Sequence, residues 1–151
     1  MYWQRYSFAD LDTNTLYTVL KLRVDVFVVE QQCPYPELDD KDRHQGALHL
    51  IGYDNGELVA YARLLPPGCS YDECSIGRVL VAPCARGRGL AHALMQQAIE
   101  ACRQQWPQSA IRIGAQDYLR QFYAALGFQA VSAVYLEDGI PHLEMLLPNA
   151  T

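Results

Sequence analysis

The chain has 151 residues, of which half are hydrophobic, and it carries a net charge of −5 at pH 7. Its length and composition are typical of one folded domain spanning residues 1–151, and its acidic balance disfavours nucleic acid as a partner because a polyanion would be repelled. No apolar stretch approaches the ~20 residues of a membrane helix and the N-terminus lacks a signal-peptide pattern, so we expect a cytoplasmic protein that does not bind membranes.

The first half of the chain predicts a helix followed by an antiparallel hairpin. Apolar residues at helical spacing predict a helix over 13–29, and the prolines that follow end it. Two strands, 49–53 and 58–64, flank Asn55-Gly56. That pair is typical of a tight hairpin turn because both residues tolerate positive φ.

The second half predicts strands that alternate with helices. In order, these are a strand over 74–81, a helix over 89–105, a strand over 111–115, a helix over 118–126, and strands over 131–135 and 142–147. A turn at Glu137-Asp138-Gly139 joins the last two strands. The whole order predicts a mixed α/β fold with a central, mainly antiparallel sheet.

A glycine-rich turn, Arg86-Gly87-Arg88-Gly89-Leu90-Ala91, connects the strand over 74–81 to the next helix. The start of a helix has unpaired N–H groups and positive partial charge, and glycine lets a phosphate approach them, so the turn suits a pyrophosphate. It is neither a Walker loop nor a dinucleotide fingerprint, which would need Gly or Ala where His92 stands. The alternative is an ordinary strand-to-helix turn.

Three segments, Val79-x-Val81-x-Pro83, residues 86–91 and Tyr123-Ala-Ala-Leu-Gly-Phe128, resemble the GCN5-related N-acetyltransferase (GNAT) superfamily in order and spacing. Residues 22–35 and 137–142 resemble its ElaA branch. The resemblance implies a single-domain GNAT fold, with a mixed, mainly antiparallel central sheet flanked by helices. It also implies direct acetyl transfer from acetyl-CoA to an amine of a small molecule or peptide. No metal is expected, since the five cysteines include no Cys-x-x-Cys pair.

The same resemblance assigns roles around acetyl-CoA. The cofactor-binding set is a strand and the loop after it, namely Val79, Leu80, Val81, Arg86, Gly87, Arg88, Gly89, Leu90 and Ala91. Gln116 stands where many members have an asparagine, and it reaches the cofactor through a longer side chain. Tyr123 takes the position of the acid that protonates the leaving thiolate, and the alternative for this residue is a core aromatic.

The general base and the acceptor site are less defined, because Ser75 stands where some members have a glutamate base. The candidates for the base are Glu73, another acid, His142 or a chain of waters. The polar residues 37–46 predict an exposed loop, and its acids, together with Glu30, would attract a cationic acceptor. The alternative for the loop acids is a solvated surface loop, and the alternative for Glu30 is a residue that braces the helix end. His142 is a second acceptor-site candidate.

Two rival functions remain at this stage. One is a non-catalytic domain that binds acyl-CoA on the same fold, and the other is a nucleotide-binding α/β domain. A homodimer is among the open oligomeric states.

Overall fold

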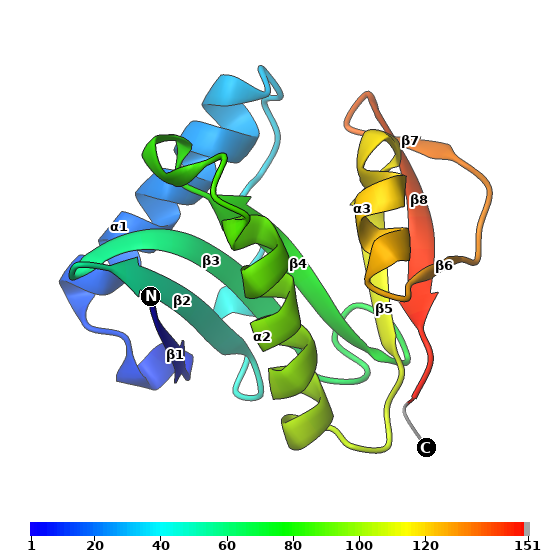
Figure 1. Ribbon diagram of the computed structural model, residues 1–151, viewed down its shortest axis with the longest axis horizontal. Coiled ribbons are helices and arrows are strands. Elements are labelled where there is room, and N and C mark those ends of the chain that lie inside the picture. Colours follow the sequence, from blue (N-terminus) through cyan, green and yellow to red (C-terminus); the bar gives the residue numbers. More distant parts are fainter. Residues whose placement is uncertain (150–151) are drawn as a thin grey trace.

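The computed structural model describes residues 1–149, which build one eight-stranded sheet (Figure 1). The strands are β1 (Tyr2–Tyr6), β2 (Leu48–Asp54), β3 (Glu57–Leu65), β4 (Cys74–Val81), β5 (Ile111–Gln116), β6 (Gln129–Ala130), β7 (Tyr135–Glu137) and β8 (Ile140–Leu147). Their order in the sheet is β1-β2-β3-β4-β5-β8-β6, with β7 also paired to β8. Only β4 and β5 pair in parallel, so the sheet is mixed and mainly antiparallel as predicted.

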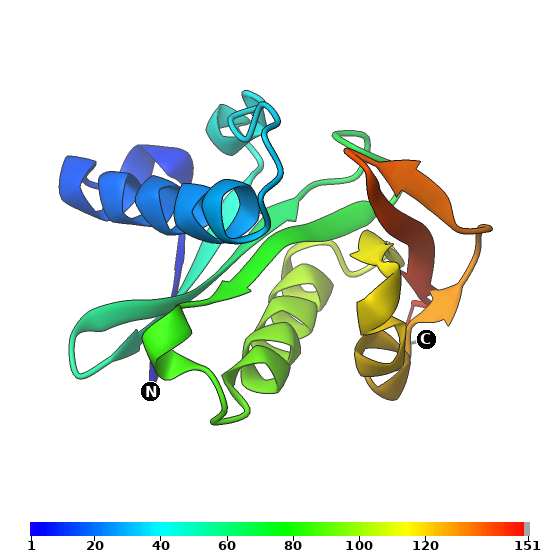
Figure 2. The same ribbon diagram turned by 90° about the horizontal axis from the view of Figure 1, so that it is seen from above.

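Three α-helices pack on the sheet: α1 (Thr13–Arg23), which continues as a π-helix over Val24–Glu30, α2 (Leu90–Gln105) and α3 (Arg120–Ala125). Short 3-10 turns lie at Phe8–Asp10, Lys41–Arg43, Pro83–Ala85 and Asp117–Leu119. Figure 2 shows α1 on one face of the sheet and α2 and α3 on the other.

The alternation of side chains along β2 and β3 explains why both faces are covered. Ile51 and Tyr61 belong to the core under α1, whereas Leu50 and Ala62 belong to the core under α2. Successive side chains of a strand point to opposite faces, so a central strand that is apolar at every position needs a helix on each side.

Both predicted hairpin turns are present. Asn55 and Gly56 have φ of 51° and 82°, and Asp138 and Gly139 have φ of 52° and 77°. These positive values are what a two-residue turn requires if it is to match the twist of the flanking strands. The helices over 13–29 and 89–105 and the strands of the central sheet are also confirmed within a few residues.

Three expectations differ from the structure. The N-terminal strand β1 was not predicted; it is an edge strand whose Trp3 ring lies over Gly52, where an added Cβ would come within 2.5 Å of the ring. Residues 131–134 are not a strand, since only the short β6 and β7 flank them. The segment 37–46 is not simply exposed, because Glu37 and Asp42 are buried. Within residues 1–149, no helix is long and apolar enough to cross a bilayer.

Candidate functional site

The sheet opens between β4 and β5. These strands pair only at Cys74 with Ile111 and at Ser75 with Arg112, and beyond those positions they diverge (Figure 1). The bend in β4 coincides with a bulge, because the register against β3 shifts and Arg78 adopts a φ of +51°. A bulge adds one residue to one strand and bends it away from its neighbour. The divergence leaves backbone N–H and C=O groups of both strands free to bind a ligand.

A cavity of about 770 Å³ occupies this opening. The predicted site residues that line it are Glu30, Val79, Leu80, Val81, Arg86, Ala91, Gln116, Tyr123 and His142. They come from six different elements, which the fold brings together around one space. The predicted cofactor strand, the predicted acid and both acceptor-site candidates therefore share one cavity.

The glycine loop forms the mouth of the opening beside α2. Gly87 and Gly89 have φ of 82° and 72°, a conformation that favours glycine, and nothing lies within 4 Å of a Cβ added at either position. The first helical hydrogen bond runs from the Ala93 N–H to the Gly89 carbonyl (3.3 Å), so the preceding N–H groups have no partner within the helix. The loop thus presents open backbone at a helix start, as an anion site requires.

The two loop arginines are not the free cations that the sequence suggested. Arg86 makes two hydrogen bonds of 2.8 Å to Glu30 and a third to the Val81 carbonyl, and Arg88 pairs with Asp54 at 3.0 Å. The hydrogen bond from Arg86 lowers the pKa of Glu30. Glu30 therefore braces the loop from the end of the π-helix, and its carboxylate is paired rather than free.

Four loop residues, Gly87, Arg88, Gly89 and Leu90, do not line the cavity. Leu90 is buried in a small core with Ala82 and Ala85, which anchors the start of α2.

Tyr123 lies on α3, across the opening from β4. Its side chain packs edge-on against Phe122 and Phe128, so the ring is part of the core, yet the residue also lines the cavity. Burial raises the pKa of Tyr123 to about 12. Within residues 1–149 the structure provides no hydrogen-bond partner for its hydroxyl, which remains available to a ligand.

His142 lies on β8 opposite Gln116 of β5. Its Nδ1 is 2.7 Å from the carbonyl of Ile140, and because a carbonyl only accepts, Nδ1 carries the proton. Nε2 is then the nitrogen with a free lone pair, and it lies 3.5 Å from a carboxylate oxygen of Glu137.

Glu73 lies away from this cavity. Its carboxylate makes hydrogen bonds of 3.0 and 3.3 Å to Arg112, at the closed end of the β4–β5 pair. The hydrogen bond to Arg112 lowers the pKa of Glu73. A carboxylate held in an ion pair outside the cavity does not deprotonate an amine inside it, so the structure argues against Glu73 as the base.

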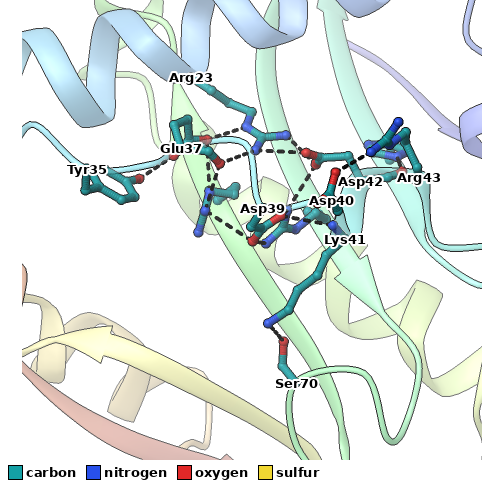
Figure 3. Close-up of polar contacts among 12 residues, drawn as sticks. Arg23, Tyr35, Glu37, Asp39, Asp40, Lys41, Asp42, Arg43 and Ser70 are labelled. Atoms are coloured by element: carbon teal, nitrogen blue, oxygen red, sulfur yellow. Dashed lines mark hydrogen bonds and ion pairs between the residues drawn. The ribbon is translucent and has the colours of Figure 1, made fainter.

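The loop over 37–46 carries a largely buried group of charges; the sequence suggested Arg23, Arg63 and Arg78 as structural ion-pair partners but not which acids they bind. We call this group the arginine–carboxylate cluster, and it consists of Arg23, Arg63, Arg78, Glu37, Asp39 and Asp42 (Figure 3). Arg23 has no exposed surface and bonds Glu37 and Asp42 at 2.5 Å each. The acids that were expected to attract a cationic acceptor are thus matched by arginines of α1, β3 and β4.

The π-helix is a further part of the site that the sequence did not indicate. It supplies Val26, Phe27 and Glu30 to the cavity wall. π-Helices are rare and often occur at functional sites. The hydrophobic spacing of residues 24–30 fits an α-helix equally well, so no sequence signal distinguishes the wider winding.

Comparison with known proteins agrees with this geometry. A family described as "Acetyltransferase (GNAT) domain" matches residues 19–148. The chain is 43% identical over 143 residues to the protein ElaA of Escherichia coli, covering 95% of this chain and 94% of that one. It is 45% identical to a UPF0039 protein of Schizosaccharomyces pombe, with 93% and 92% of the two chains covered.

Solved structures agree as well. An acyl-CoA N-acyltransferase from Pseudomonas aeruginosa superposes with a TM-score of 0.92 at 43% identity, over 97% of this chain and 99% of that one. The crystal structure of Escherichia coli ElaA gives a TM-score of 0.91 at 41% identity, over 98% and 100% of the two chains. Members of this family use acyl-CoA to acylate amines. The chain belongs to the GNAT acetyltransferase family, in its ElaA/UPF0039 group.

Proposed function

We propose that this protein transfers an acetyl group from acetyl-CoA directly to the amine of a small molecule or peptide. The observation that carries the proposal is the opening between β4 and β5, with the glycine loop at one side and the Tyr123 hydroxyl free on the other. The opening holds both reactants together, so proximity and orientation supply much of the rate gain.

The residues present fit acetyl-CoA. The divergent backbone of Val79, Leu80 and Val81 suits the amide-rich pantetheine arm, since an open strand edge pairs with an extended chain. The N–H groups around Gly87 and Gly89 suit the pyrophosphate, because no side chain crowds them. Gln116, which bonds Gln31 at 3.3 Å, remains a candidate cofactor contact on β5.

In the proposed reaction the amine nitrogen attacks the thioester carbonyl, a C–N bond forms and the C–S bond breaks. We assign the proton of the attacking amine to Nε2 of His142, whose Nδ1 is held by the Ile140 carbonyl. The sulfur leaves as a thiolate, which solvent later protonates.

The role of Tyr123 is proposed from its place in the cavity lining, where its hydroxyl has no partner among the described residues and burial raises its pKa to about 12. A phenol that weakly acidic stays protonated and donates a hydrogen bond to the developing thiolate rather than giving up its proton. This differs from the general-acid role expected from the sequence, although it uses the same hydroxyl.

The proposal is tested by calorimetry with acetyl-CoA, NAD and ATP, followed by thiol-release assays over a panel of amines. We expect binding of acetyl-CoA alone and thiol release that depends on an amine. Binding of acetyl-CoA without release for any amine would instead favour the non-catalytic acyl-CoA-binding function.

A further inference from the structure

The arginine–carboxylate cluster leaves the acceptor side of the cavity without a free acid from the loop over 37–46. Glu37 bonds Arg23 and Arg78, Asp39 bonds Arg63 and Arg78, and Asp42 bonds Arg23 and Arg63. These contacts match three arginines with three carboxylates. The fourth acid, Asp40, pairs with Arg43 at the surface, and neither of them lines the cavity.

Lys41 carries a positive charge that has no ion-pair partner in this arrangement. It stands between Asp40 and Asp42 in the chain, and among residues 1–149 no carboxylate oxygen lies within 4.0 Å of its ammonium. The side chain turns away from the acids and donates a hydrogen bond of 2.8 Å to the Ser70 hydroxyl (Figure 3). Lys41 and Ser70 come from separate loops, and both line the cavity. Lys41 is partly buried, and Ser70 is exposed to solvent.

A second polar group on the same wall also has no partner. Arg63 lines the cavity and is buried, and its Nε is the buried side-chain nitrogen that finds no hydrogen bond within the described chain. Because this nitrogen is shielded from solvent and the other guanidinium nitrogens bond Asp39 and Asp42, Arg63 is a structural part of this wall and its charge is matched, unlike that of Lys41.

The cavity lining also carries negative charge. Glu137 and Asp138, in the turn between β7 and β8, line the cavity and are exposed. An ammonium and carboxylates from separate elements around one cavity are complementary to a molecule that itself carries both signs.

We propose that the acceptor is an amine that also carries a carboxylate, and that Lys41, together with the Ser70 hydroxyl, binds this carboxylate. The inference deepens the proposed acetyl transfer and rests on it. One unmatched ammonium complements one negative charge, which favours a carboxylate over a doubly charged phosphate ester. The acceptor amine then lies toward His142 and Glu137. This reverses the polarity that the acidic loop suggested for the acceptor site.

The test is a set of acceptors that differ only in the carboxylate. Steady-state thiol release at saturating acetyl-CoA is measured for L-phenylalanine and L-lysine, for their carboxamides, and for phenethylamine and cadaverine, which lack the carboxyl group. A second series, from glycine to 6-aminohexanoate with each matching carboxamide, varies the spacing between amine and carboxylate. We expect the best carboxylate acceptor to have a KM at least ~10-fold below that of its carboxamide.

Two matched variants connect this preference to Lys41. Lys41→Met keeps the side-chain length without the charge and is expected to raise the KM of the carboxylate acceptor to that of its carboxamide. Arg43→Met removes a positive charge from the same 3-10 turn but outside the cavity, and is expected to keep the preference.

Equal KM values for carboxylates and carboxamides in the unaltered protein would overturn the inference without any variant. So would a preference that Lys41→Met leaves intact. Either result leaves acetyl transfer standing, since amines still react. No thiol release with any amine would remove the transferase function and this inference with it.

Discussion

Next to the cavity, at the start of α2, the chain presents backbone: two glycines in left-handed conformations and a helix start, with both loop arginines already paired. At the end beneath the loop over 37–46, the chain presents side chains, most of them matched within the arginine–carboxylate cluster. The first region depends on residues adjacent in the chain, and the second on residues from several elements. A local sequence motif can therefore predict the glycine loop, but it cannot predict how the charges of the cluster pair.

The largest effect is expected from breaking the arginine–carboxylate cluster. Arg23→Met removes the fully buried cation that Glu37 and Asp42 share and leaves them only Arg78 and Arg63, and the loss of one partner from a buried ion pair costs about 3–5 kcal/mol. Urea denaturation measures this as a lower free energy of unfolding. Lys21→Met on the same helix is the control, because its ion pair with Asp25 is exposed and its loss should leave the stability nearly unchanged. Similar losses for both variants would contradict a buried structural role.

Tyr123→Phe should reduce turnover by roughly 10²-fold, the scale of a lost donor to a developing charge. Acetyl-CoA affinity and the melting temperature should hold, because the ring packs as before and the hydroxyl has no partner in the described chain. Tyr17→Phe, an exposed tyrosine of α1, is the control. Unchanged turnover in the Tyr123 variant would leave Tyr123 as a core aromatic only.

The backbone beside the cavity is tested by two substitutions of equal size. Gly89→Asn and Gly89→Asp both enter a left-handed position that these residues tolerate better than others, and space is open there. Only aspartate places a negative charge at the helix start. Calorimetry should give a Kd for acetyl-CoA about 10-fold weaker for Asp than for Asn, equivalent to ~1.4 kcal/mol. Equal affinities would mean that the phosphates bind elsewhere.

The smallest effect concerns the pH dependence of stability that comes from Asp39 in the arginine–carboxylate cluster. Burial alone would raise the pKa of Asp39, but the hydrogen bonds and charge of Arg63 outweigh it and lower the pKa to about 2. Stability from Asp39 is therefore full above its ordinary pKa of 3.8 and is lost as the pH falls toward 2. Melting curves of the unaltered protein and Asp39→Asn should differ slightly at pH 6 and converge near pH 2. A constant difference across this range would contradict the assignment.

Much of the fold was predictable because it depends on local chemistry. Helical spacing, Asn55-Gly56 and the prolines after the first helix each act within a few residues, and the structure confirms the elements they predict. Strand β1 was missed because an edge strand buries little apolar surface and so shows no alternating pattern. The strand over 131–135 was overpredicted, since its valines are exposed or half-exposed in a connecting segment.

The family, the mainly antiparallel sheet and the glycine loop could be inferred from the amino-acid sequence alone, because each depends on residue types at short, regular spacing. Which charges are free depends instead on how the elements pack. Glu30 forms an ion pair with Arg86, and the buried acids of the loop over 37–46 form ion pairs with Arg23, Arg63 and Arg78. The interaction of two charges falls off with their separation in space, and residues 14 to 56 positions apart in the chain have no fixed separation until the sheet and helices pack.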